Sequence, residues 1–520
     1  MNPEAPTATA PGIERAGPAL VSRSNSVGSA RTDAWSVRRG LMLVLLYSIP
    51  VIMALQPVVD PDVFWHVKVG EWIVEHRAVP WTDSFSEYGA GRPWIAYNWL
   101  FEVIFHAAYE ALGLYGIVLY RLVLGLGLAA VMHAFVSRGG APFLPGVLLT
   151  AVGLSALGPL VLPRSFLISI LCFLAVVHVV MVCRESGATR PLLVLPLLFV
   201  VWANMHIQYV YGLFVLGLAA LEPLIHRVAR VNLLGPPATA LPFRAAVLTL
   251  LACGVASTLT PYHVHLHISV VEVVGQTWIY QYLNELRPLA FRSAWDWLVL
   301  GLALAAAFAL GWRRQLQPFP VLLLVFGVLV SFRSIRDVWV VIIAAVTILS
   351  SGIATAPAHS VRRPAAWRGM GLVAVGIVAI GAIVVLARGL TPARLEAAVA
   401  DRYPVGAAAF VERQGYRGPL FNEYGWGGYL IWRLPGIPVS MDGRANLHGD
   451  ERIKRTAATW QGLPEWQADP ELGAANLVIG PRTAPLASLL RLDDRFELAY
   501  EDDVAVVFTA RTSRPQPTAR

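Results

Sequence analysis

The chain has 520 residues, of which 56% are hydrophobic and only 14% are charged, whereas soluble domains carry about 25% charged residues. This composition excludes a simple soluble protein and predicts a polytopic membrane protein. The formal net charge is +8. The arginines cluster in short loops between apolar segments, so the excess of positive charge indicates the orientation of the chain in the membrane. No nucleic-acid motif is present, and we expect no nucleic-acid partner.

Residues 1–40 are rich in Ala, Pro, Ser and Arg and lack apolar periodicity, which predicts a disordered tail. The arginines of this tail place it in the cytoplasm. The apolar run 41–57 is expected to be an uncleaved first span, because the tail is too long for a signal peptide and no small-residue cleavage site follows.

Ten further apolar stretches are predicted to cross the membrane, for which about 20 residues are needed. They are residues 114–136, 144–160, 166–182, 192–203, 209–225, 245–259, 297–312, 319–332, 338–353 and 370–387. The resulting membrane domain covers residues 41–388. Alternate loops carry the arginines, which obey the positive-inside rule, and eleven spans then leave the C-terminal segment outside the cytoplasm.

The first outer loop, residues 58–113, is long and rich in Trp. Apolar residues recur with helical spacing around Trp65–Ile73 and again around Trp94–Ile104, so we expect two amphipathic helices that lie along the membrane interface. The tryptophans favour a role as interface anchors over a sugar-stacking platform.

Residues 389–511 have the composition of a soluble domain. Short β runs at 477–480, 496–501 and 504–509 alternate with helical patterns, which predicts a small extracytoplasmic α/β domain. The last residues, 512–520, are expected to form a disordered tail.

Two carboxylates, Asp60 and Asp62, follow the first span within a few residues, and His66 and Lys68 come about one helical turn later. Carboxylates at a bilayer boundary cost free energy unless they are solvated or paired, so this placement indicates function. The alternative is that the two aspartates cap the helix that begins near Phe64.

Polar groups also occur in the other outer loops, and we expect them to converge with the aspartates on one cavity. The candidate substrate- or phosphate-binding residues are His66, Lys68, Arg164, His206, Arg287, Arg333 and Arg336. A carboxylate can accept the proton of an attacking hydroxyl, and arginines can hold a phosphate leaving group. This combination predicts glycosyl transfer from a lipid-phosphate sugar, with Asp60 and Asp62 as catalytic residues. Snorkelling for Arg333 and Arg336, and capping for His206, are the structural alternatives.

A metal site is the remaining chemical possibility in the outer loops. His263, His265 and His267 could contribute zinc ligands, and Asp60-Pro-Asp62 has the shape of a metal-binding pair. No cysteine or carboxylate completes the histidine set, so we expect no obligatory cofactor, with a divalent metal left open.

Several phrases resemble a known superfamily: Asp60-Pro-Asp-Val-Phe-Trp-His66, Trp202-Ala-Asn-Met-His206 and Asn422-Glu-Tyr-Gly-Trp-Gly-Gly-Tyr429. With an acidic first outer loop and an outer C-terminal domain, the chain resembles an uncharacterised bacterial branch of the GT-C superfamily of polyprenyl-phosphate-sugar glycosyltransferases. The resemblance implies a hexosyl- or pentosyltransferase in the bacterial inner membrane, with an undecaprenyl- or similar polyprenyl-phosphate donor and a cell-envelope glycan, lipid or protein as acceptor. It also implies that Asp60 or Asp62 is the catalytic base or orients the acceptor.

Two other functions remain open at this stage. A transporter or flippase of lipid-linked sugars would need a polar path through the membrane, and the predicted spans carry few charges. Alternatively, Asn422–Tyr429 and Asp442-Gly-Arg444 could bind an acceptor on the C-terminal domain, although their glycines and the Asp-Gly pair are also typical of turns.

Overall fold

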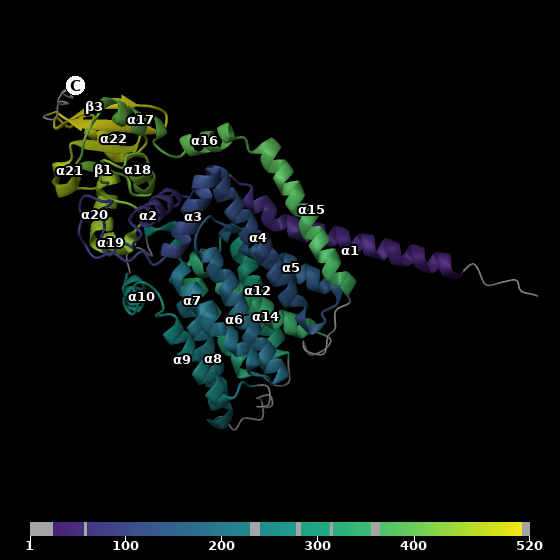
Figure 1. The fold of residues 1–520 in the computed structure, drawn as a ribbon. Coiled ribbons are helices and arrows are strands. Elements are labelled where there is room, and N and C mark those ends of the chain that lie inside the picture. The colour runs from purple at the N-terminus through teal and green to yellow at the C-terminus, as the bar shows by residue number, and fades with distance from the viewer. Residues whose placement is uncertain are drawn as a thin grey trace, which may run out of the picture.

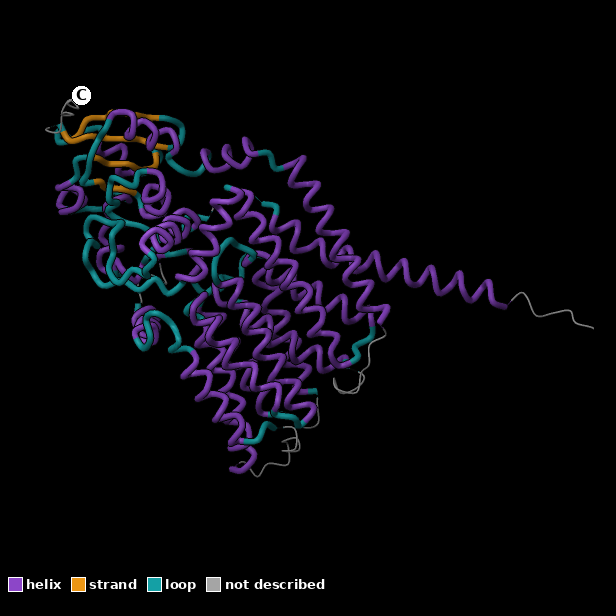
Figure 2. The backbone as a smooth tube through the Cα atoms, viewed as in Figure 1, coloured by secondary structure: helices purple, strands orange, loops and turns teal. Residues whose placement is uncertain are grey.

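The computed structural model describes residues 24–56, 60–228, 240–276, 282–312, 316–354 and 365–511. A bundle of long helices makes up most of the molecule, and a compact domain with a small sheet lies at one end of it (Figures 1 and 2). This arrangement confirms the predicted class, a polytopic helical membrane protein with a small C-terminal α/β domain. The predicted tails at 1–23 and 512–520 lie outside the described residues.

The first helix is longer than the sequence analysis predicted. Helix α1 spans Ser24–Ala54, so the prediction of disorder for residues 1–40 is wrong from Ser24 onward. The prolines of the tail end at Pro18, and the following stretch contains no residue that breaks a helix as proline does. The apolar span therefore continues toward the N-terminus as helix, away from the bundle (Figure 1).

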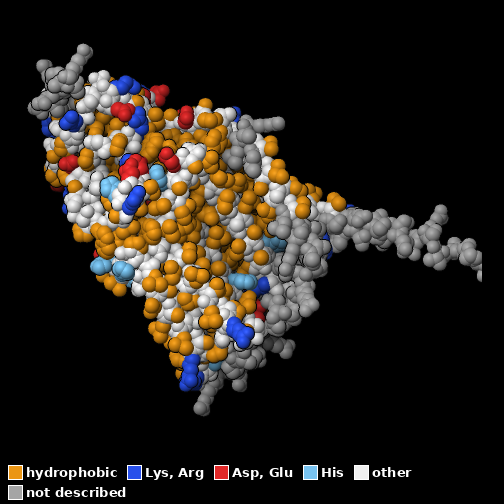
Figure 3. All heavy atoms as spheres, in the orientation of Figure 1, with side chains coloured by type: hydrophobic (Ala, Val, Ile, Leu, Met, Phe, Trp, Pro, Cys, Tyr) orange, Lys and Arg blue, Asp and Glu red, His pale blue; other side chains and the backbone are white. Residues whose placement is uncertain are grey.

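Seven helices among the described residues are long and apolar enough to cross a membrane, and they lie within residues 37–54, 114–136, 143–160, 166–186, 209–228, 294–311 and 335–353. Three other predicted spans form shorter apolar helices within residues 190–205, 243–256 and 318–333, and a further short one covers His265–Gly275. The fourth, residues 370–387, lies within helix α15 (Ala365–Gly389), whose residues 373–382 are apolar. Hydrophobic side chains cover most of the visible bundle surface (Figure 3). The chain is thus a multi-pass membrane protein.

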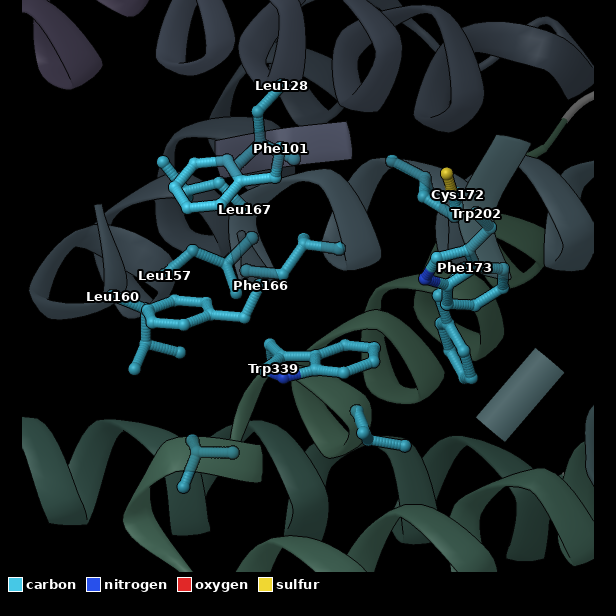
Figure 4. Close-up of a cluster of buried hydrophobic side chains, with 14 of the residues drawn as sticks. Phe101, Leu128, Leu157, Leu160, Phe166, Leu167, Cys172, Phe173, Trp202 and Trp339 are labelled. Carbon is cyan, nitrogen blue, oxygen red and sulfur yellow. The ribbon is translucent and has the colours of Figure 1, made fainter. Parts of the chain in front are cut away.

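The helices of the bundle follow one another through short connections. They are α4 (Leu114–Val136), α5 (Phe143–Leu157), α6 (Phe166–Ser186), α7 (Leu195–Met205), α8 (Tyr209–Val228), α9 (Phe243–Ala256), α10 (His265–Gly275), α12 (Ala294–Gly311), α13 (Pro318–Arg333), α14 (Trp339–Ile353) and α15 (Ala365–Gly389). Helix α14 is buried along nearly its whole length, because helices pack on several of its sides. Trp339 at its start meets Phe173 of α6 with ring centroids 5.1 Å apart (Figure 4).

The first outer loop contains two helices, α2 (Val63–His76) and α3 (Trp99–Leu112), as the apolar periodicity predicted. Trp94 precedes the second helix and is buried. The segment between the helices is held by isolated bridges, including Thr82 with Pro93.

The C-terminal domain is built on a four-stranded sheet of order β1-β2-β4-β3. Strands β1 and β2 are parallel, whereas β2 with β4 and β3 with β4 are antiparallel. The strands are β1 (Leu420–Asn422), β2 (Leu477–Pro481), β3 (Phe496–Glu501) and β4 (Ala505–Ala510). The helices are α16 (Pro392–Ala400), α17 (Val405–Gln414), α18 (Gly427–Arg433), α19 (Ala445–His448), α20 (Asp450–Trp460), α21 (Pro470–Ala474) and α22 (Pro485–Leu490). The sequence predicted the last three strands and missed β1.

Buried ion pairs join this domain to the first outer loop. Arg444 donates to Asp83 at 2.5 Å and to both carboxylate oxygens of Asp442 at 2.8 and 2.7 Å. Backbone bonds add to the contact, since the N–H of Glu87 donates to Val439 at 2.9 Å. Asp442 and Arg444 are almost fully buried, so they hold the domain in place and do not form an open acceptor site.

Gly427 and Gly428 of the Asn422–Tyr429 segment allow close packing and do not form turns. Gly428 lies in α18, where a Cβ atom would collide with the carbonyl of Pro61 and the ring of Trp65. Gly427 is similarly tight against the backbone of Met441. The C-terminal domain is therefore packed directly on the loop that carries Asp60 and Asp62.

Candidate active site

A cavity of about 410 Å³ lies where the outer loops of the bundle meet the C-terminal domain. Its charged and polar lining comes from five separate connections and from the domain, and it includes Asp62, His66, Asn98, Arg164, Gln208, Glu285, Arg336, Asp337 and Tyr424. Four of the predicted site residues, Asp62, His66, Arg164 and Arg336, thus face one space. They come from segments up to 274 residues apart in the sequence.

Arg164 is the central cation of this site. Its Nε donates to Asp60 Oδ2 at 2.6 Å, and its Nη1 lies 3.1 Å from Asp62 Oδ2 and 2.9 Å from Glu285 Oε1. Arg164 precedes α6 and is only 8% exposed. Both aspartates of the first outer loop are therefore held by a cation from a loop about 100 residues away.

The two aspartates have different environments. Asp60 is 6% exposed and also accepts the backbone N–H of Asp62 at 3.0 Å. Both oxygens of its carboxylate therefore have hydrogen-bond partners. Asp62 accepts from Trp65 Nε1 at 3.0 Å and lines the cavity. Burial raises the pKa of Asp62 to about 6, and the nearby charge of Asp60 also raises it while Arg164 opposes the shift. Asp62 precedes α2 but makes no side-chain cap, so capping does not explain it.

Glu285 occupies a position between two guanidinium groups. It lies in a short 3-10 turn, η5 (Asn284–Leu286), and its Oε1 is 2.9 Å from Arg164 Nη1 and 3.8 Å from Arg336 Nη1. Its side chain is 31% exposed, whereas Arg164 is buried. A partly exposed carboxylate shared by two arginines marks a place where another anion can bind.

Several buried polar atoms around the cavity have no hydrogen-bond partner among the described residues. They are Asn98 Oδ1, Gln208 Oε1, Arg336 Nε and Tyr424 Oη, and all four residues line the cavity. Buried polar atoms normally have partners, so such a gathering needs an explanation. A polar ligand in the cavity would supply it.

Glu102 is a site residue that the sequence analysis missed. It lies on α3, it is 1% exposed, and its Oε1 is 3.1 Å from Nδ1 of His66. The signal that could have revealed it is an acidic residue between Phe101 and Phe105, on the apolar side of a predicted amphipathic helix.

Five predicted residues do not line this cavity: Asp60, described above, and Lys68, His206, Arg287 and Arg333. Lys68 pairs with Glu71 on α2 at 2.7 Å. His206 is buried behind the wall of the cavity, with its Nδ1 2.8 Å from Ser169 Oγ. Arg333 ends α13. Arg287 faces an adjoining cavity of about 400 Å³, which Asp62 and Tyr424 also line.

An apolar groove of about 620 Å³ adjoins the site on the bundle side. Residues of α1 and of the segment after α5 line it, and Asp60 and Arg164 stand at its polar end. Ile52 of its lining is 64% exposed on the bundle surface. Arg121 within it donates to backbone carbonyls, including those of Gln56 and Met53 at 2.7 Å. Arg164 therefore separates an apolar groove from a polar cavity.

No group of three or more His, Cys, Asp or Glu side chains within the described ranges is arranged to hold a metal ion. The three histidines proposed as zinc ligands have different neighbours. His267 Nε2 lies 3.0 Å from Ser257 Oγ, and the His265 ring meets Trp81 at 5.6 Å. The Asp60 and Asp62 carboxylates both pair with Arg164.

The fold and the site together define a polytopic membrane protein with a carboxylate and two arginines in one cavity at the end of its helix bundle. No protein-family model matches the chain, and no curated protein matches it in sequence. Among solved structures, ArnT from Cupriavidus metallidurans in the apo state shares 14% identity, with 94% of this chain and 100% of that chain covered and a TM-score of 0.49. The same protein bound to undecaprenyl phosphate shares 14% identity, with 93% and 99% covered and a TM-score of 0.40.

Proposed function

We propose that the chain is an integral-membrane glycosyltransferase that moves a sugar from a polyprenyl-phosphate donor to an acceptor outside the cytoplasm. The observation that carries this proposal is the cavity in which Asp62 faces Arg164 and Arg336. A base for the acceptor and cations for a phosphate leaving group are the two requirements of this reaction.

The phosphate site is proposed to be the position of the Glu285 carboxylate. A phosphate there would replace the contacts of Glu285 with Arg164 and Arg336. The planar guanidinium of each arginine can donate two hydrogen bonds to phosphate oxygens. The polyprenyl tail would then lie in the apolar groove on the other side of Arg164.

In the transfer step, the acceptor oxygen attacks the anomeric carbon and forms the new glycosidic bond. Its proton passes to the Asp62 carboxylate. The bond between the anomeric carbon and the phosphate oxygen breaks, and its electron pair remains on the phosphate, where Arg164 and Arg336 offset the charge. Because the carboxylate form of Asp62 must accept the proton, a pKa of about 6 leaves it ionised at neutral pH.

Asp60 is assigned a positioning role. Its oxygen holds Arg164 Nε at 2.6 Å and it does not line the polar cavity. It therefore fixes the guanidinium that contacts Asp62.

The proposal places the N-terminus in the cytoplasm and the C-terminal domain outside, in a bacterial inner membrane, as the positive-inside rule predicts. The sugar is a hexose or pentose, and the acceptor is a cell-envelope glycan, lipid or protein. Asp494→Cys places a thiol at an exposed position of the C-terminal domain, whereas Cys172, Cys183 and Cys253 are buried. This thiol should react with an impermeant thiol reagent from the outside of intact cells. Labelling only after lysis would show that the C-terminal domain lies in the cytoplasm.

The experiment is transfer in proteoliposomes that contain the lipid-linked sugars of the native membrane. Asp62→Asn should lower product formation by roughly 10²- to 10⁴-fold while binding of undecaprenyl phosphate persists. Asp494→Asn is the matched control on an exposed surface. Full activity of Asp62→Asn refutes the proposed base, and movement of lipid-linked sugar across sealed vesicles without a covalent product would support a transporter instead.

A further inference from the structure

The buried pair of Glu102 and His66 has no part in the transfer step above. Glu102 Oε1 and His66 Nδ1 are 3.1 Å apart, and the two residues are 1% and 3% exposed. The second oxygen of Glu102 is buried and has no hydrogen-bond partner among the described residues. Within the same residues, the imidazole of His66 is the polar group that the Glu102 carboxyl contacts.

The imidazole is fixed in orientation by rings on both sides. The Trp65 ring lies 3.7 Å from it between centroids, and Phe101 meets it edge-on at 5.0 Å. With Nδ1 facing Glu102, Nε2 is the ring atom left for the cavity that His66 lines. A carboxylate that orients one nitrogen so that the other can exchange a proton is a recurrent arrangement in proteins.

The charges around the cavity indicate a role for the pair of Glu102 and His66. The described lining holds the carboxylates of Asp62, Glu285 and Asp337 against the guanidiniums of Arg164 and Arg336. A phosphate that enters adds negative charge to a site already rich in carboxylates. Some group must supply compensating positive charge, because an uncompensated charge in a buried site is costly.

We infer that His66 supplies this charge: it takes up one proton from water when a phosphate binds beside Arg164 and Arg336, and then donates from Nε2 to a phosphate oxygen, with Glu102 as the positioning residue. The inference rests on the proposed phosphate site. The proton enters with the ligand and leaves with it, so no other reactant is needed.

The groups that face His66 act in the required direction. In the free cavity, burial lowers the pKa of His66, the contact with Glu102 opposes this, and the charges of Arg164 and Arg336 lower it further. A bound phosphate offsets those two cations and so raises the pKa of His66. Burial also raises the pKa of Glu102, with His66 opposing, so the pair can hold a proton without a net charge. Asp62 on the adjoining loop also titrates, with a pKa of about 6, and His206 faces His66 from the end of α7.

The experiment is calorimetric titration of the purified full-length protein with undecaprenyl phosphate at neutral pH, in buffers of different ionisation enthalpy. The dependence of the heat on the buffer gives the protons taken up per lipid bound. His66→Gln keeps a polar N–H group near the Nε2 position and removes the titration, so it should take up fewer protons than the wild type, by up to one. Glu102→Gln should show a similar loss. His76→Gln, an exposed histidine on the same helix, should match the wild type.

Asp62→Asn separates the two titrating groups. The difference caused by His66→Gln should persist in the Asp62→Asn background, since Asp62 would contribute separately. Wild-type affinity should rise toward lower pH by up to about tenfold per unit between the free and bound pKa values of His66, and this slope should flatten in His66→Gln. The titration of the lipid phosphate itself is common to all variants and cancels.

The outcomes distinguish this inference from the proposed function. Equal proton uptake by wild type and His66→Gln, with normal lipid binding, overturns the inference and leaves the phosphate site intact. Absence of binding by the wild type overturns both. If His66→Gln fails to fold in a thermal unfolding assay, Glu102→Gln decides, and unchanged uptake in that variant refutes the inference.

Discussion

Replacement of Glu285 by glutamine tests the proposed phosphate site directly. Glu285 is the carboxylate that bridges Arg164 and Arg336, so a lipid phosphate must displace it before it can bind both arginines. Glutamine has nearly the same shape and lacks the charge. Glu285→Gln should therefore bind undecaprenyl phosphate more tightly than the wild type.

The size of the effect follows from the geometry of the two ion pairs. The contacts are 2.9 and 3.8 Å long, and the Glu285 side chain is 31% exposed. Partly exposed ion pairs contribute roughly 0 to 1 kcal/mol each, so loss of the competitor should favour lipid binding by about 1 kcal/mol. This is roughly a fivefold decrease in Kd.

The assay is equilibrium binding of undecaprenyl phosphate to the protein in lipid nanodiscs, at low and high salt. Glu497→Gln on the exposed face of β3 makes the same chemical change away from the cavity and should leave Kd unchanged. High salt should reduce the gain, because it screens the exposed part of the ion pairs. Weaker binding by Glu285→Gln would show that Glu285 holds the ligand and does not compete with it.

Three further predictions address the base and the packing of the C-terminal domain. Transfer by the wild type should rise with pH through about 6, the pKa of Asp62, and level off above it, because the ionised carboxylate accepts the proton; a rate that falls over this range would refute the assignment. Arg444→Met leaves Asp83 buried without its cation and should lower the free energy of unfolding by about 3–5 kcal/mol in a thermal or denaturant assay. Gly428→Val pushes a side chain into Pro61, so the rate of transfer should fall by a larger factor than the equilibrium constant for folding; an unchanged rate would contradict the packing of Gly428 against Pro61.

The membrane architecture could be predicted from the sequence because apolar length and loop charge are local properties. Apolar runs predicted the positions of the helices, and their alternation placed Asp62, Arg164 and Arg336 on the same side. Eleven spans were predicted, whereas seven helices among the described residues are long and apolar enough to cross a membrane, because apolar composition alone does not fix where a helix ends. Helix α7, for example, ends at Met205, just before the buried His206.

The division of roles within the site could not be predicted in this way. Asp60 and Asp62 are equivalent in the sequence and both contact Arg164, but only Asp62 lines the cavity. Glu102 contacts His66, and Glu285 contacts Arg336. These partners are distant in the chain, so the roles of the two glutamates depend on the fold. Lys68 was predicted from its proximity to Asp62, but its side chain points toward Glu71 on the same helix. Spacing over one helical turn does not determine which of these carboxylates the lysine contacts.

The packing of the C-terminal domain also determines how its function can be studied. Removal of residues after Leu390 would take Arg444 away from Asp83 and would remove Gly428, which packs against Trp65. Such a truncation removes structural support from the Asp62 loop, so loss of transfer would not show that the domain binds an acceptor. Gly443 is the better probe, because it lines the cavity and a Cβ atom there would meet the Asp62 carboxylate. A substitution at Gly443 alters the space beside the proposed base and leaves the partners of Arg444 in place, so it separates the domain's part in the site from its part in the fold.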